Sequence, residues 1–235
     1  MMPAIDTGAI PLAARKIAAA TWQRLLVQED RSRAFTARVV GDLERLGAPA
    51  TILRASRRVV DDEARHVFLC ENVVRALGFA PTRPPVVLDA LPEDDEAFER
   101  AMAEILVAGF AVGETMSVGG FAAVGAAASE PLVCATLREL TRDEARHGAF
   151  GEHAGAWLLR GWSPQRRHAL WPACIAAMES LEERAGGPLG ALPDVESDPE
   201  LAALGAPAAH VGAAGVLDAV TRWVLPRLVR LGVIR

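Results

Sequence analysis

The chain has 235 residues, a formal net charge of −5 at pH 7 and 51% hydrophobic residues, which suits one domain with a sizeable buried core. Its lysines and arginines are scattered along the sequence, so we expect no basic face of the kind that binds nucleic acid. Three widely spaced cysteines without a Cys-x-x-Cys pair exclude a disulfide framework and a cysteine-ligated metal module.

The beginning of the sequence bears on where the protein is located. Residues 1–14 lack a basic stretch followed by an apolar run, so we expect no signal peptide. Unpaired cysteines are also typical of a reducing compartment. A cytoplasmic location is therefore expected.

The first two predicted helices form an antiparallel hairpin. Apolar residues recur at helical spacing over residues 13–46 and again over 51–77, and Gly78 is placed to end the second helix. Glu29 and Glu63 lie on the apolar stripes of these two helices. Both carboxylates are therefore expected to point into the protein.

A proline-rich segment over residues 79–92 predicts a non-helical crossover, since proline removes a backbone donor and restricts the residue before it. A third helix is expected to follow, to about residue 128. Residues 105–129 contain a single charged residue, Glu114, which makes them long and apolar enough to be a candidate membrane span. Their abundant glycine and alanine instead favour the central helix of a soluble bundle with no stable membrane span.

The remainder of the chain is also predicted to be helical, with no persistent strand pattern. The expected order is a helix over 131–161, a fifth helix over 163–185, an exposed loop over 186–199, a short helix over 199–204 and a last helix over 210–231 that bends at Pro226. The fold class is therefore all-α. We expect a single domain, 1–235, with a four-helix core at about 12–160 and a C-terminal helical extension at about 163–235.

A five-residue motif, Asp-Glu-Ala-Arg-His, occurs twice, at residues 62–66 and 143–147. Within each copy the Glu and the His are three residues apart, so on a helix both side chains leave the same face and can hold one metal ion between them. Both copies align with apolar stripes, unlike the solvated helix faces that salt bridges usually cover. The two copies indicate two halves of a metal site.

Two single glutamates complete a candidate ligand set. Glu29 and Glu63 are 34 residues apart, and Glu114 and Glu144 are 30 apart. About 15 residues on each side of a short turn bring two positions level in an antiparallel hairpin, so each single Glu is expected opposite a Glu-x-x-His. An unpaired carboxylate in the apolar third helix would be costly. The neighbours of Glu29 are polar, and an exposed Glu29 is the alternative.

Four carboxylates that converge in an apolar bundle repel one another unless cations lie between them. Mixed carboxylate and imidazole ligands suit iron or manganese better than a soft metal. The candidate set therefore indicates a pair of such ions.

With these residues, the chain resembles the ferritin-like di-iron carboxylate oxidases and oxygenases. The resemblance covers about residues 12–160 and implies a ferritin-like four-helix bundle with additional C-terminal helices. It implies that Glu63 and Glu144 are bridging or near-bridging ligands, Glu29 and Glu114 terminal ligands, and His66 and His147 one nitrogen ligand for each metal. It also implies that Asp62 and Asp143 orient the histidines and that Arg65 and Arg146 are their ion-pair partners.

The resemblance implies a non-haem di-iron oxygenase or oxidase with two iron ions, or a manganese and iron pair, and dioxygen as co-substrate. The substrate would be a small organic molecule that undergoes N-oxygenation, hydroxylation or aldehyde deformylation, with electrons from an external donor such as a ferredoxin or reductase. A homodimer is expected. On the third helix, small residues near Glu114 would leave space for the substrate, namely Gly113, Ser117 and Gly120.

Other members of this superfamily fit the sequence less well. The chain has no tyrosine, which argues against a radical-generating reductase subunit, and it has no cysteine-rich module of the rubrerythrin type. The additional histidine of the N-oxygenases has no match at Leu140. An iron-oxidising storage or detoxification protein and a structural bundle with a vestigial site are the alternatives.

Several other polar residues are expected to have ordinary roles. His153, His168 and His210 have no partner at ligand spacing, which indicates surface or capping positions. Arginines make the last helix basic, at positions Arg222, Arg227, Arg230 and Arg235. We expect that helix to present a solvated face or a dimer contact, with attachment to a membrane or a partner as the alternative.

Overall fold

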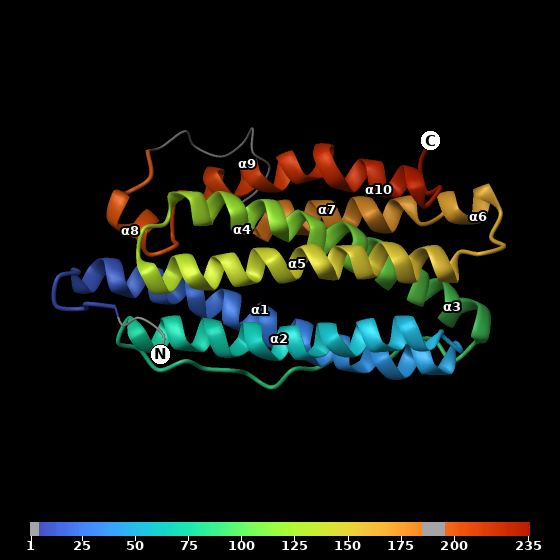
Figure 1. Cartoon of the computed structure of the whole chain (residues 1–235), viewed down its shortest axis with the longest axis horizontal. Coiled ribbons are helices and arrows are strands. Elements are labelled where there is room, and N and C mark those ends of the chain that lie inside the picture. The colour runs from blue at the N-terminus through green and yellow to red at the C-terminus, as the bar shows by residue number, and fades with distance from the viewer. Residues whose placement is uncertain (1–4, 185–195) are drawn as a thin grey trace.

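The computed structural model describes residues 5–184 and 196–235, and within these ranges the chain is helical with no strand. Figure 1 shows α1 and α2 on one side of the molecule, α4 and α5 in the middle, and α7, α9 and α10 on the other side. The predicted all-α class is confirmed for the described residues.

Helices α1 (Leu12–Arg45) and α2 (Ala50–Ala76) form the predicted hairpin and pack along their length. The turn at the end of α2 is made by Gly78, whose φ of 91° is a conformation that glycine adopts without a steric penalty. Both helices begin directly after a proline, Pro11 and Pro49. The observed bounds lie within a residue of the predicted ones.

The crossover over residues 79–94 contains no helix, as its prolines predict, and it follows α1. The Gln23 side chain exchanges two hydrogen bonds with the backbone of Thr82. Further along, the Arg45 guanidinium donates to the carbonyl of Glu93, 3.1 Å away. These bonds fix the direction in which the chain re-enters the bundle.

The third helix is continuous but not uniform. It consists of α3 (Asp95–Glu104), a π-helical stretch η1 (Ile105–Glu114) and α4 (Thr115–Ala127). The sequence predicts an ordinary α-helix here, which is wrong for η1. The uniformly apolar residues of this stretch carry no periodicity that could distinguish a wide helix from an α-helix. The π-helical stretch ends at Glu114.

Helix α5 (Pro131–Leu158) packs against η1, α4 and α2. The contact with η1 is close because of Gly151, at which a Cβ atom would lie 2.4 Å from the Ala111 nitrogen and 2.7 Å from the Leu106 oxygen. The absence of a side chain at Gly151 therefore sets how near the third helix comes to α5.

The C-terminal part differs from the prediction in its details. The structure has α6 (Pro164–His168), α7 (Trp171–Arg184), α8 (Pro199–Ala203), α9 (Ala209–Ala219), a π-helical stretch η3 (Val220–Val224) and α10 (Leu225–Arg230). The predicted fifth helix is thus divided in two.

The predicted bend coincides with η3, just before Pro226, which has no N–H to continue an α-helical pattern. Most of the loop predicted over 186–199 lies outside the described residues.

The C-terminal helices pack closely on the bundle through glycines. A Cβ atom at Gly119 on α4 would lie 2.1 Å from the Gly215 oxygen on α9. A Cβ atom at Gly215 would lie 2.2 Å from the Gly119 oxygen. The backbones of α4 and α9 therefore touch. Helix α7 covers η1 from the same side.

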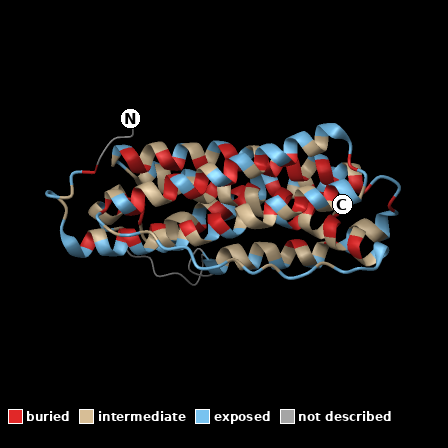
Figure 2. Cartoon of the chain, turned by 90° about the horizontal axis from the view of Figure 1, so that it is seen from below, coloured by how far each residue is buried: buried red, intermediate tan, exposed pale blue. Residues whose placement is uncertain are grey.

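Buried apolar side chains form two clusters along the bundle. On α1, Leu26 belongs to one and Val39 to the other; on α5, Leu140 and Phe150 are divided in the same way. The buried acidic and histidine residues of both helices lie between these positions. Figure 2 shows the buried residues concentrated inside the bundle and the crossover largely exposed.

One helix within the described residues, Asp95–Ala127, is long and apolar enough by length and composition to cross a membrane. Half of its most apolar window is buried inside the protein. This burial fits the expected central helix of a soluble bundle.

The close contact at Gly151 generates a stability prediction. Gly151→Ala should destabilise the protein by about 1–3 kcal/mol, because the new methyl group overlaps the backbone of η1. Gly109→Ala is the matched control: Gly109 lies in η1 with no atom near its Cβ position, so this change should stabilise by about 0.5–1 kcal/mol. Urea unfolding of both variants measures the difference, and equal effects would contradict the packing described.

Candidate metal centre

The six predicted ligands meet at the middle of the bundle. Glu29 comes from α1, Glu63 and His66 from α2, Glu114 from the end of η1, and Glu144 and His147 from α5. All are buried except Glu114, which is partly buried. With 5% exposure, Glu29 follows the inward prediction and not the exposed alternative.

The six residues form two groups, and each group could hold a metal ion. One contains Glu29, Glu63, His66 and Glu144, and the other contains Glu63, Glu114, Glu144 and His147. In each group one candidate ligand atom per residue lies within 4.8 Å of all the others. Glu63 and Glu144 belong to both groups, so their carboxylates lie between the two positions.

Both histidines turn Nδ1 toward these carboxylates. His66 Nδ1 lies 3.2 Å from Glu29 Oε2 and 3.5 Å from Glu144 Oε1. His147 Nδ1 lies 3.2 Å from Glu63 Oε1 and 3.3 Å from Glu144 Oε2. The Nδ1 atoms are therefore the candidate nitrogen ligands.

The opposite ring nitrogens face aspartates across the helix pair. His66 Nε2, on α2, lies 3.4 Å from Asp143 Oδ2 on α5. His147 Nε2, on α5, lies 3.5 Å from Asp62 Oδ2 on α2. Each motif thus supplies a histidine to its own half-site and an aspartate to the histidine of the other motif.

Two arginines bind both aspartates. Arg65 donates to Asp62, at 2.7 Å, and to Asp143. Arg146 donates to Asp62, at 2.9 Å, and also to Asp143. The predicted acid and arginine partners are therefore in contact, in an arrangement that crosses between α2 and α5.

The arginines keep the aspartates ionised. Burial acts to raise the pKa of Asp62 and Asp143, but hydrogen bonds from the histidines and arginines outweigh it and hold both pKa values well below the usual range. Asp143 accepts the Nε2 proton of His66 at 3.4 Å, and that tautomer leaves the Nδ1 lone pair of His66 free to bind a metal. Asp62 faces Nε2 of His147 at 3.5 Å without a hydrogen bond.

Several buried atoms in the cluster have no hydrogen-bond partner in the described structure: Glu63 Oε2, Glu144 Oε2 and both ring nitrogens of His147. They lie close to one another, but their geometry is not that of hydrogen bonds. Buried polar atoms without partners are costly. These atoms are the oxygen and nitrogen donors that iron and manganese accept, so the residues fit a pair of such ions.

Without metal, the cluster favours protonated groups. Burial, together with the charges of Glu29 and Glu114, raises the pKa of Glu63 to about 7, and burial also raises the pKa of Glu144. Burial acts to lower the pKa of His66, but Asp143 and the nearby glutamates raise it to about 9. The pKa of His147 is raised in the same way by Asp62 and the glutamates.

A cavity of about 250 Å³ lies beside the centre, between α1, α4, α5 and the C-terminal helices. Gln28, next to Glu29, lines it, as do Ser117 and Gly120 on the helix that follows Glu114. The space predicted near Ser117 and Gly120 is therefore present. Gly113, the third residue of that prediction, is not among the lining residues. We call this the α1/α4 cavity.

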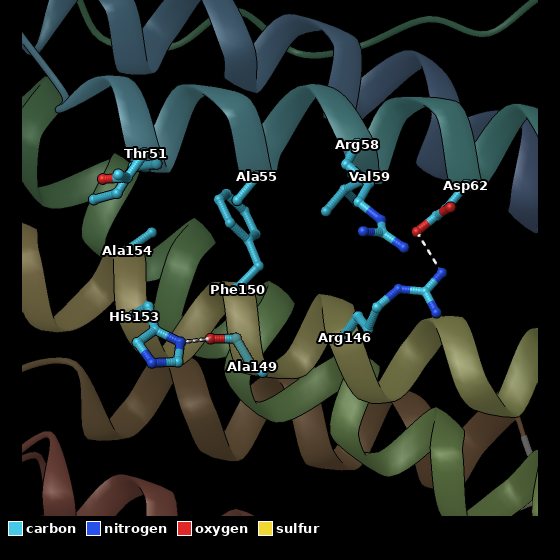
Figure 3. Close-up of a pocket in the computed structure, with 11 residues that line it drawn as sticks. Thr51, Ala55, Arg58, Val59, Asp62, Arg146, Ala149, Phe150, His153 and Ala154 are labelled. Atoms are coloured by element: carbon cyan, nitrogen blue, oxygen red, sulfur yellow. Dashed lines mark hydrogen bonds and ion pairs between the residues drawn. The ribbon is translucent and has the colours of Figure 1, made fainter.

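A second cavity, of about 420 Å³, lies between α2 and α5 and was not predicted. Figure 3 shows Ala55, Val59 and Phe150 on its walls, with Asp62 and Arg146 paired at one end. This ion pair is part of the layer formed by Asp62, Asp143, Arg65 and Arg146, which the Nε2 atoms of the two histidines face. We call it the α2/α5 cavity.

The last helix contributes a residue that sequence reasoning missed. The Arg227 guanidinium contacts the hydroxyl of Thr115, next to Glu114, and lies 3.2 Å from Glu152 Oε2. Arg230 also pairs with Glu152. The prediction of a wholly solvated face is therefore wrong at Arg227, whose side chain is 16% exposed. No local pattern marks this residue, because arginine is common on exposed helix faces.

The remaining histidines lie outside both ligand groups, as predicted. His153 and His168 each place Nδ1 near a backbone carbonyl, that of Ala149 and that of Val233.

Scans against protein-family models, curated protein sequences and solved structures found no match to this chain.

Metal binding should release protons near neutral pH. Glu63 and both histidines must be deprotonated to bind a cation. The pKa is raised to about 7 for Glu63 and to about 9 for His66, so each group is mostly protonated when the pH is below its pKa. The apparent affinity for Mn²⁺ should therefore increase as the pH rises through this window. Calorimetric titrations in buffers of different ionisation enthalpy measure the released protons, and uptake without release would contradict these shifts.

Removing the charge of one aspartate should weaken metal binding. We expect Asp62→Asn to lower the affinity roughly tenfold to a hundredfold, because the Nε2 atom of His147 loses the negative charge that it faces. Asp61→Asn is the matched control, since Asp61 is the exposed neighbour on the same helix. Competition with a chelator measures both affinities. Equal affinities for the two variants would show that Asp62 does not orient a ligand.

Proposed function

We propose that this protein is a non-haem di-iron oxygenase or oxidase of the ferritin-like kind that oxidises a small organic substrate with dioxygen. The observation that carries the proposal is the pair of four-residue groups that share Glu63 and Glu144. Four carboxylates and two Glu-x-x-His histidines from four helices form the ligand set of ferritin-like di-iron and di-manganese proteins. A manganese and iron pair would use the same residues.

In this proposal Glu63 and Glu144 would be shared between the two ions, and Glu29 and Glu114 would each hold one. His66 would bind the ion beside Glu29, and His147 the ion beside Glu114. When bound, the metal pair supplies the electrons that reduce dioxygen. Renewed turnover then requires an external electron donor, such as a ferredoxin or reductase.

The surrounding residues support this chemistry in three ways. Asp143 and Asp62 face the Nε2 atoms of His66 and His147, so both Nδ1 atoms point toward the glutamates. The apolar clusters on either side of the centre exclude water from it. The α1/α4 cavity is lined by Gln28, next to Glu29, and by Ser117, three residues after Glu114, and it has room for a small organic molecule. This cavity favours an organic substrate over the iron-storage alternative.

Metal content tests the ligand assignment. After anaerobic loading with ferrous iron, the native protein should retain about two irons per chain, and Glu63→Ala with Glu144→Ala should retain almost none, because both ions lose a shared ligand. Glu71→Ala with Glu139→Ala is the matched control, since these partly exposed carboxylates lie on the same two helices. Elemental analysis of the desalted proteins gives the stoichiometry. Unchanged iron in the first variant would refute the centre.

Oxygen consumption separates an oxygenase from a storage protein. With about two ferrous ions per chain, an oxygenase should oxidise them once and then require an electron donor for further oxygen uptake. A storage protein would instead continue to oxidise added ferrous iron without a donor and accumulate ferric mineral. That second result would replace the proposed function with the alternative.

A further inference from the structure

We propose that the α1/α4 cavity binds a small amphipathic organic acid, whose anionic group is held by Arg24 and Arg184 at the exposed rim of the cavity. This inference rests on the proposed function for the identity of the reaction, but binding itself requires no oxygen chemistry. The ligand class is a compact apolar group that carries one carboxylate or phosphate.

The walls of the cavity are mostly apolar. Trp22 and Leu137 are buried and lie at its inner side, and further aliphatic and aromatic side chains complete it: Leu25, Phe121, Val124, Leu181 and Val216. The volume of about 250 Å³ is below the usual range for drug-sized ligands. The cavity therefore suits a ligand with a small apolar body.

The charges that line the cavity are all of one sign. Arg24 and Arg184 are exposed and line it, whereas no lining residue carries a carboxylate. Within the described chain neither arginine has an ion-pair partner: Arg24 donates to Thr21 Oγ1 at 3.1 Å, and Arg184 donates to Ser180 Oγ at 2.6 Å. Guanidinium groups hold carboxylates and phosphates through paired charge-assisted hydrogen bonds.

The positions of the arginines set the orientation of the ligand. Arg24 and Arg184 are exposed, whereas Trp22 and Leu137 are buried in the same lining. The anionic group is therefore attracted to the exposed arginines, and the apolar body extends toward the buried side chains.

The α2/α5 cavity is a poorer site for an anion. Its lining contains Arg58 and Arg146 but also the carboxylate of Asp62. Arg146 is already paired with Asp62 and Asp143. Arg58 is the remaining exposed arginine of that lining, which makes it a matched control for Arg24 and Arg184.

Calorimetric titration of the full chain with matched probes tests the inference. The probes are benzoate against benzamide and hexanoate against hexanamide, with phenyl phosphate to distinguish a phosphate ligand from a carboxylate. At least one acid should bind about tenfold more tightly than its amide, or phenyl phosphate should do so relative to benzamide. Arg24→Gln with Arg184→Gln should reduce this preference to less than about threefold, and Arg58→Gln should leave it intact.

Three results would overturn the proposal: no acid binds, acid and amide bind equally, or Arg58→Gln removes the preference while Arg24→Gln with Arg184→Gln retains it. Oxygen uptake by the iron-loaded protein is measured in parallel. If the acids bind as expected but no oxygen is consumed, the oxygenase assignment fails and the ligand class stands. If oxygen is consumed and no acid binds, the ligand class alone fails.

Discussion

The exchange of aspartates between α2 and α5 is the interaction on which the rest of the centre depends. Asp62 and Asp143 each face the histidine of the opposite helix, and Arg65 and Arg146 bind both acids. This layer fixes the register of the two helices, because a shift of one residue would separate all four charged groups from their partners. The positions of the glutamates on α2 and α5 follow from the same register.

Burial makes the centre a costly arrangement that a pair of cations would relieve. The apolar clusters at both ends keep water away, and the raised pKa of Glu63 shows how strongly the surroundings disfavour uncompensated negative charge. Backbone packing brings in a further candidate ligand, Glu114. Gly151 lets η1 approach α5, and Glu114 occupies the last position of that wide helix. The charged layer and the close helix packing thus act together to position the candidate ligands.

The sequence was sufficient to predict the all-α class, the bounds of α1 and α2 and the six converging residues, because proline and glycine mark the ends of these helices and the doubled motif has a spacing that places Glu and His on one helix face. It did not predict η1, whose residues are apolar on every side. It also left open which aspartate serves which histidine, since identical motifs permit pairing within or between helices. The contact of Arg227 with Thr115 spans 112 residues, and nothing local to either residue indicates it.

That long-range contact can form only when almost the whole chain has been synthesised. All six candidate ligands precede Arg227 in the sequence, so the ribosome makes them before the helix that supports the residue next to Glu114. Until α10 docks, Thr115 lacks its guanidinium partner. A chain that ended before Arg227 would keep every candidate ligand and lose this support.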